Sequence, residues 1–239
     1  MNDLTSALGM AARLIGSADA ALLEIVGLSI KVSLTAVAFA AAIGMPLGAL
    51  LAVARFRGRR TIIVLINTLM GLPPVVVGLL VYLMLSNQGP LGVLQLLYTP
   101  AAMIAAQTLL ITPIIAALAR QTIKDLNGEY DEQLRIFGLT AFERVQTLLY
   151  EGRVRLATAL LAGFGRAIAE VGAVIIVGGN INHVTRTMTT AIALETSRGN
   201  LALALALGLI LLSMALAINA VVLGLRPKRQ TSGPLGVRP

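Results

Sequence analysis

One pair of ionisable residues lies inside an apolar stretch of the sequence. Arg166 and Glu170 are four positions apart, so on a helix they share a face and can form an ion pair. An unpaired charge costs about 2.5 to 3.5 kcal/mol in the middle of a bilayer, so the pair should face protein or a water-filled cavity. Two interpretations fit: the pair lines a translocation path or its gate, or it locks its helix to a neighbour.

A second group combines a cation with hydroxyl donors. Arg186 is surrounded in the sequence by Thr185, Thr187, Thr189 and Thr190. Charge-assisted hydrogen bonds are the stronger ones, so this combination suits a tetrahedral dianion. The same segment would equally suit contact with a soluble protein, or be an ordinary polar loop.

The sequence lacks the motifs of nucleotide hydrolysis and of metal catalysis. Its only lysines are Lys31, Lys124 and Lys228, and none follows a glycine-rich phosphate loop. His183 is the only histidine, which we expect to be solvated, and cysteine is absent. The chain is therefore predicted to be no enzyme and to bind no cofactor itself, so energy for any transport must come from a gradient or from a separate subunit.

Composition places most of the chain in lipid. Hydrophobic residues make up 57% and charged residues 13%, with a mean hydropathy of +0.86. The net charge of +8 does not indicate nucleic-acid binding, because the basic residues are scattered in short segments and only 4% of residues are aromatic.

Apolar stretches predict an all-α integral membrane protein with five transmembrane helices. The predicted spans are residues 27–54, 62–85, 99–119, 156–177 and 201–225. Fourteen of the nineteen basic residues fall in alternate connections, which indicates that the N-terminus is outside and the C-terminus is cytoplasmic. Residues 1–24 suit a helix in the outer interface or a frayed terminus, residues 25–225 form the transmembrane domain, and residues 226–239 form a cytoplasmic tail.

Small residues and prolines mark special points within the spans. Gly44 and Gly48 permit close helix approach, for instance at a seam between subunits. The run Gly71-Leu-Pro-Pro74 and the pair Thr112-Pro113 predict helix kinks, which serve packing or a hinge.

The predicted cytoplasmic loop at residues 120–155 carries many charges of both signs. Two helical pieces meeting at Gly138 would fit it, with Leu139, Phe142 and Val145 on one face of the second piece. Such a face could dock a soluble partner, or could lie on the membrane or on the chain's own subunit.

This loop resembles that of the permease subunits of ABC importers. Glu132-Gln133-Leu134, followed by Gly138, occupies the register of their Glu-Ala-Ala and glycine signature, with Gln133 and Leu134 in place of the alanines. The resemblance implies a coupling helix that seats in an ATPase subunit. The residues it implicates are Glu132, Leu134, Gly138, Leu139, Phe142, Arg144 and Val145.

A more specific resemblance covers residues 162–181 and 187–196. The runs Ala169-Glu-Val-Gly-Ala173 and Val177-Gly-Gly-Asn-Ile181 are similar to the oxyanion-importer permeases, and most like their tungstate branch. This implies a homodimer in a bacterial or archaeal cytoplasmic membrane, with ABC ATPase subunits that use ATP and an extracytoplasmic binding protein. Molybdate and sulfate are alternative cargoes. Two other classes of protein also stay open: a gradient-driven carrier and a membrane scaffold that transports nothing.

Overall fold

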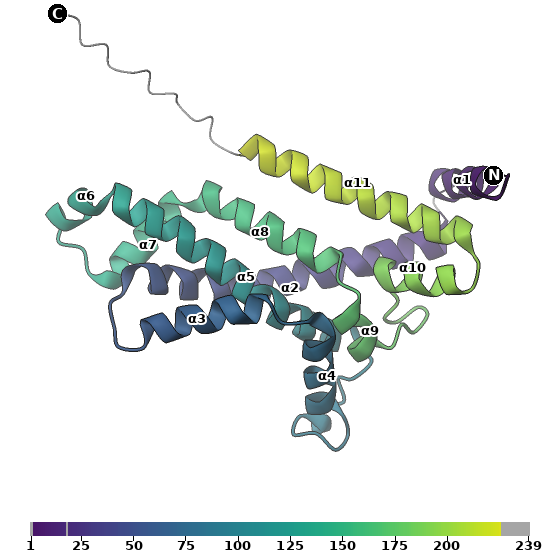
Figure 1. Ribbon diagram of the computed structural model, residues 1–239, viewed down its shortest axis with the longest axis horizontal. Coiled ribbons are helices and arrows are strands. Elements are labelled where there is room, and N and C mark those ends of the chain that lie inside the picture. Colours follow the sequence, from purple (N-terminus) through teal and green to yellow (C-terminus); the bar gives the residue numbers. More distant parts are fainter. Residues whose placement is uncertain (1, 18, 226–239) are drawn as a thin grey trace, which may run out of the picture.

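The computed structural model describes residues 2–17 and 19–225, and all the regular secondary structure of that part is helical (Figure 1). The predicted tail at residues 226–239 lies outside the described residues. In chain order the elements are α1 (Asn2–Gly16), α2 (Ala20–Val53), α3 (Arg59–Met70), α4 (Pro74–Leu85), the 3-10 turn η1 (Gly92–Leu94), α5 (Pro100–Glu129), α6 (Asp131–Ile136), α7 (Ala141–Glu151), α8 (Arg153–Ile168), α9 (Gly172–Gly178), α10 (Met188–Ser197) and α11 (Leu201–Leu225).

Three helices, α2, α5 and α11, are each long and apolar enough to cross a membrane alone. At 1.5 Å per residue, the 34 residues of α2 extend about 51 Å, well beyond a hydrocarbon core of about 30 Å. The helix begins at Ala20, earlier than hydropathy predicts, because the side chain of Asp19 accepts a hydrogen bond from the amide of Leu22 at 3.1 Å.

Two predicted spans are each a bent pair of helices. The stretch at residues 62–85 divides into α3 and α4, which meet at 101°, and the stretch at residues 156–177 divides into α8 and α9, which meet at 59°. The kink predicted at Gly71-Leu-Pro-Pro74 is therefore present, whereas the break between α8 and α9 was not predicted. Counting each bent pair as one span raises the candidate spans in the described residues from three to five.

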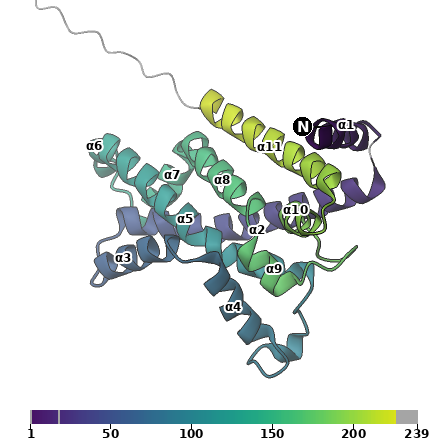
Figure 2. The ribbon, with the colours of Figure 1, turned by 45° about the vertical axis from the view of Figure 1, so that its right-hand side comes forward.

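The first bend follows from the sequence Gly71-Leu-Pro-Pro74. Pro73 is extended and Pro74 is the first residue of α4, and neither proline can donate the backbone hydrogen bond that would continue α3. The base of α4 is then held by α9. A Cβ on Gly78 would lie only 2.7 Å from the Cα of Ala173, so the two backbones touch. Beyond this contact α4 projects away from the other helices (Figures 1 and 2).

The most extensive contact in the molecule is between α2 and α5. A Cβ on Gly48 would lie 2.4 Å from the carbonyl oxygen of Ala116, and a Cβ on Gly44 would lie 2.9 Å from that of Thr112. The two glycines therefore permit close helix approach, as predicted, and the partner is α5 of the same chain.

Two groups of helices lie toward opposite ends of this pair (Figure 1). At one end α6 and α7 pack on α2 and α5 around Leu134, Val145 and Leu148. At the other, α1, α10 and α11 pack on α2 and α8, with Met188 and Leu207 in that core. The predicted N-terminal helix is present as α1, and it lies against α11.

Candidate functional site

Glu170 occupies the break between α8 and α9, where it connects three parts of the chain. Its side chain is 4% exposed and accepts a hydrogen bond from Arg166 at 2.5 Å. The same carboxylate accepts a bond from the amide of Ala173, in the first turn of α9, at 3.1 Å. Its backbone carbonyl accepts a bond from the hydroxyl of Thr189, in α10, at 2.7 Å. The predicted ion pair is therefore present, and its acid also caps a helix.

The two members of the pair differ in exposure. Glu170 is buried, whereas the side chain of Arg166 is 39% exposed. The turn just before the break is also held by Gln107 of α5, whose amide donates to the carbonyl of Ala167 at 3.1 Å. The other amide atom of Gln107, Oε1, is buried without a hydrogen-bond partner in the described residues.

The threonines near Arg186 are buried and bonded within the chain. Thr187 and Thr190 form a capping box at the start of α10, and the hydroxyl of Thr189 is engaged by Glu170. Thr185 donates to the carbonyl of Gly178 at 2.5 Å and accepts from the amide of Ile181 at 2.9 Å. These hydroxyls hold the segment that joins α9 to α10.

Arg186 itself is half-buried, and its Nε atom has no hydrogen-bond partner among the described residues. It lines a small pocket with Glu24, at the start of α2, and with His183. His183 is exposed, as predicted, and its Nδ1 lies 2.8 Å from a carboxylate oxygen of Glu24. The loop that contains Arg186 is thus tied to the start of α2.

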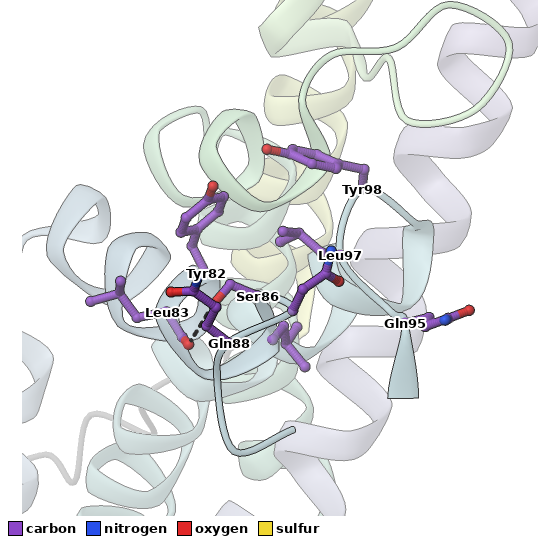
Figure 3. A pocket seen from close by; sticks show the side chains of 9 residues that line it. Tyr82, Leu83, Ser86, Gln88, Gln95, Leu97 and Tyr98 are labelled. Carbon is purple, nitrogen blue, oxygen red and sulfur yellow. Dashed lines mark hydrogen bonds between the residues drawn. The ribbon is translucent and has the colours of Figure 1, made fainter. Parts of the chain in front are cut away.

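A larger pocket, of about 620 Å³, lies at the end of α4 (Figure 3). It contains no charged side chain; hydroxyls and amides supply its polar groups, including those of Tyr82, Gln88, Gln95 and Tyr98. The rings of Tyr82 and Tyr98 meet edge to face at 6.4 Å between centroids. The phenol of Tyr82 beside it raises the pKa of Tyr98 above its ordinary value of 10.0.

The wall of this pocket at Tyr98 packs closely against the end of α9, where the run at residues 177–181 has two glycines. The amide of Tyr98 donates to the carbonyl of Val177 at 2.9 Å. Gly179 has a φ of +70°, and a Cβ there would lie 2.8 Å from a ring carbon of Tyr98. A Cβ on Gly178 would lie 3.0 Å from the side chain of Met103 in α5. Both positions therefore need glycine for close packing.

The loop between α5 and α8 forms the predicted pair of short helices. Gly138, with a φ of +63°, makes the turn between α6 and α7, as the sequence indicated. Thr140 caps α7: its hydroxyl and amide donate to Glu143 at 2.7 and 2.9 Å, and its hydroxyl accepts from the amide of Glu143 at 3.4 Å. These bonds hold the pKa of Glu143 below its ordinary value of 4.5.

The two short helices are joined by a salt bridge. Arg144 of α7 donates to the carboxylate of Asp131 at the start of α6, and Arg135 lies 3.0 Å from its other oxygen. Arg144, with a smaller contribution from Arg135, holds the pKa of Asp131 below its ordinary value of 3.8. The relative position of α6 and α7 is therefore fixed by charge as well as by packing.

The predicted apolar face of α7 is divided in the structure. Val145 is buried with Leu148 against α5, and Leu139 packs partly on the same core, whereas Phe142 is 70% exposed. The three residues therefore divide between the alternatives: Phe142 is exposed, whereas Val145 and Leu139 pack on the chain's own core, because α2 and α5 cover that side of α7. The exposed apolar surface here consists of Ile136, Phe137 and Phe142.

The other residues predicted to act in this loop are likewise divided between exposed and buried positions. Glu132 is exposed, Leu134 is buried in the core beneath α6, and Arg144 is mostly buried. Sequence reasoning missed Ile136 and Phe137, although two adjacent apolar residues in a charged loop are a usable signal. It also missed Gln107, a lone polar side chain in an apolar span, and the Tyr82–Tyr98 pair.

Comparison with known proteins decides the family. Residues 44–230 match the family described as the inner membrane component of binding-protein-dependent transport systems. The chain belongs to this family. It is a multi-pass membrane permease subunit, not an enzyme.

Relatives of this permease include two that are 41% identical to it. One is the probable anion ABC transporter permease protein of Haloferax volcanii, aligned over 90% of this chain and 94% of the relative. The other is the tungstate uptake system permease protein TupB of Peptoclostridium acidaminophilum, over 90% of this chain and 95% of the relative. The sulfate transport system permease protein CysW of Escherichia coli K12 is 25% identical over 74% of this chain and 63% of the relative.

Proposed function

We propose that this permease passes a tetrahedral oxyanion, tungstate before molybdate or sulfate, across the cytoplasmic membrane of a bacterium or archaeon. The observation that carries the proposal is the 41% identity to the tungstate permease of Peptoclostridium acidaminophilum over 90% of this chain. The named sulfate relative is more distant, at 25%. A binding protein outside the membrane delivers the anion, and a separate ATPase subunit supplies the energy from ATP; the permease chain itself binds no cofactor.

The proposed topology has five spans, with the N-terminus outside and the C-terminus in the cytoplasm. The three long helices and the two bent pairs supply enough crossings, and the distribution of basic residues supports the orientation. In this topology α6 and α7 face the cytoplasm, while α1, α10 and the pocket beside Tyr98 face outside. Within residues 1–24, α1 then provides the outer interfacial helix, and α2 begins the transmembrane domain assigned to residues 25–225.

The absence of cysteine makes this topology easy to test. Single cysteines replacing Asn87 and Phe137 would lie on opposite sides of the membrane. A membrane-impermeant maleimide added to spheroplasts should label Asn87→Cys, and should label Phe137→Cys only after lysis. The reverse pattern would overturn the orientation.

The working unit is proposed to be a homodimer. Helix α4 projects from the bundle (Figure 2). One broad side of this helix is apolar and exposed. The exposed side chains on that side are Val75, Val76, Leu79, Leu80, Leu83 and Met84. A second copy would cover part of this surface and place two coupling loops side by side, one for each ATPase subunit.

Coupling to the ATPase is assigned to the surface formed by Ile136, Phe137 and Phe142. Leu134, Leu139 and Val145 support this surface from beneath, and the Asp131–Arg144 salt bridge fixes its shape. Glu132 lies exposed at its edge and Gly138 makes the turn within it. Closure of the ATPases would then act on α5 and α8, which bracket the loop.

The gate is assigned to the break at Glu170, and anion contact to Arg166 and Arg186. Alternating access would change the bend between α8 and α9, which Glu170 holds through Arg166, Ala173 and Thr189. The Nε donor of Arg186 has no partner within residues 2–17 and 19–225, whereas Thr187, Thr189 and Thr190 are bonded within the chain. These threonines therefore position the path instead of supplying its free donors.

Reconstitution tests the proposal as a whole. The permease, its ATPase subunit and its binding protein are placed in liposomes, and uptake is measured for tungstate, molybdate and sulfate. We expect ATP-dependent uptake with tungstate preferred. Uptake that persists without the ATPase would indicate a gradient-driven carrier, and a lack of anion-stimulated ATP hydrolysis would indicate a scaffold.

A further inference from the structure

The corner between α2 and α3 carries four arginines to which the transport proposal gives no role other than in orienting the chain. Arg55, Arg57, Arg59 and Arg60 fall within six positions, and the sequence contains no Asp or Glu between residues 25 and 124. Among the described residues, none of the ion pairs involves any of the four. The corner is therefore a concentration of positive charge that the described part of the chain does not neutralise.

Arg59 has a structural task within this corner. Its Nε donates to the carbonyl of Leu51 at 2.6 Å, and its Nη2 donates to that of Ala52 at 3.5 Å. These carbonyls belong to the last turn of α2, where a helix leaves its acceptors without intrahelical partners. Arg59 thus fixes the turn, and Arg55 and Arg60 remain free to act on something else.

Arg55, Arg59 and Arg60 line an open pocket of about 400 Å³. Its other walls include Phe56, which is 43% exposed, and Ile63. The pocket lies at the start of α3, where Gly58 supplies no side-chain cap, so the positive end of the helix dipole adds to the field of the arginines. A ligand here would meet cationic and apolar groups together.

We propose that this pocket binds the phosphate headgroup of an anionic glycerophospholipid. The pocket begins two residues beyond the end of α2 and directly after the predicted span at residues 27–54, and the proposal places it at headgroup depth. Exposed apolar side chains continue from it along α3, including Val64 and Leu65, and would accompany the acyl chains. Basic pockets beside transmembrane helices bind anionic headgroups in this way.

A lipid fits these surroundings better than a soluble anion. Inorganic phosphate or the transported oxyanion would use the arginines but not Phe56, Ile63 or the apolar side of α3. The assignment to a lipid depends on the membrane location of the family. In the proposed topology the corner between α2 and α3 faces the cytoplasm, so the lipid lies in the cytoplasmic leaflet, and only this placement rests on the proposed function.

The test uses the full-length permease purified in detergent and native mass spectrometry. The protein is titrated with dioctanoyl phosphatidylglycerol and, separately, with dioctanoyl phosphatidylcholine. We expect preferential binding of phosphatidylglycerol, and an affinity about tenfold lower in the variant Arg55→Gln/Arg60→Gln. The variant Arg55→Lys/Arg60→Lys keeps the charge and should keep most of the preference.

A matched control removes two charges elsewhere. In Arg153→Gln/Arg155→Gln the lost cations come from α8, where Arg153 lies over the ring of Tyr150 and Arg155 pairs with Glu129. This variant should bind phosphatidylglycerol like the wild type. An equal loss in both double variants would overturn the proposal, because it would indicate attraction by overall charge.

Soluble anions separate the possible ligands. Millimolar inorganic phosphate or tungstate should leave the bound phosphatidylglycerol in place, and displacement by either would overturn the assignment to a lipid. Because the assay contains no ATPase and no binding protein, a failure of tungstate transport would leave its result unchanged. The two proposals can therefore fail separately.

Discussion

The hydroxyl of Thr189 donates a 2.7 Å hydrogen bond to the backbone carbonyl of Glu170, which joins the first turn of α10 to the break between α8 and α9. Both residues are buried. A carbonyl at a helix break lacks its usual intrahelical partner. The hydroxyl of Thr189 therefore supplies a hydrogen bond to an acceptor that would otherwise be buried without one.

Replacing Thr189 by Val should therefore destabilise the protein. The two side chains have nearly the same shape, but Val leaves the carbonyl of Glu170 buried and unsatisfied, at a cost of about 1 to 3 kcal/mol. Thermal unfolding of the purified permease measures the change. Thr68→Val is the control, because Thr68 is exposed on α3 and its hydroxyl bonds only to its own helix. Equal melting temperatures for the two variants would contradict the role of Thr189.

The Arg166–Glu170 pair should behave as a coupled unit. Glu170→Ala removes the cap of α9 and leaves Arg166 without its partner, whereas Glu170→Gln keeps one acceptor oxygen and can retain one of the two hydrogen bonds. We expect Glu170→Ala to be the less stable variant, and the double variant Arg166→Ala/Glu170→Ala to be about 1 kcal/mol more stable than the sum of the single changes. Strict additivity in this double-mutant cycle would argue against the pair.

Transport then separates the gate from simple packing. If Glu170→Gln unfolds like the wild type, a loss of uptake in it points to the charge acting in the translocation path. If both uptake and stability stay at wild-type values, the pair serves neither role.

Gly179→Ala should cost more than Gly138→Ala. Both glycines have φ near +65°, so an alanine is strained by about 1 kcal/mol at either position. A Cβ on Gly138 meets open space, whereas a Cβ on Gly179 meets the ring of Tyr98 at 2.8 Å. In the double variant Gly179→Ala/Tyr98→Ala the steric part of the penalty should disappear. The test compares the unfolding midpoints of the wild type, the two single glycine variants and the double variant. An equal loss of stability at both glycines would exclude the clash.

Phe142→Ala and Val145→Ala should have opposite consequences. Phe142 is 70% exposed, so its removal should change stability by less than about 0.5 kcal/mol while weakening capture of the ATPase subunit. Val145 is 8% exposed, and its truncation should destabilise α7 by about 1 to 3 kcal/mol. Co-purification with the ATPase, read beside thermal unfolding, distinguishes the two effects. Full ATPase capture by Phe142→Ala would remove Phe142 from the proposed surface.

Acid should loosen the contact between α6 and α7. The folded protein holds the pKa of Asp131 below 3.8, so its carboxylate stabilises the folded state fully above that pH and loses this contribution as the pH falls through the folded value. A fluorophore on a single cysteine replacing Ile136 would report the change between pH 6 and pH 3. Asp131→Asn removes the titrating group and should abolish that part of the response.

Hydropathy predicted the bounds of some helices closely. For others it predicted only that the stretch is apolar enough to span a membrane. The predicted last span at residues 201–225 coincides with α11, and the predicted third span begins within one residue of α5. Hydropathy carries no information on direction, so it read α3 and α4 as one span although they meet at 101°. The prolines indicated where the bend lies, but its angle depends on the contact between Gly78 and Ala173, which are distant in sequence.

Side-chain roles were predictable where they are local. The four-residue spacing of Arg166 and Glu170 was enough to predict their pairing, and Gly138 was enough to predict a turn. The exposure of Phe142 was not predictable, because packing against α2 and α5, which are distant in the sequence, determines which side of α7 is buried. Nor could the sequence indicate that the threonine hydroxyls beside Arg186 are already bonded within the chain.

The seam between α2 and α5 limits where this protein can move. At Gly48 the two backbones are so close that sliding one helix along the other would drive the neighbouring Cβ-bearing residues into carbonyl oxygens. These two helices, the longest among the described residues, therefore move together as one rigid unit. The two bent spans, by contrast, are interrupted at residues 71–73 and 169–171, where no continuous helical ladder resists bending.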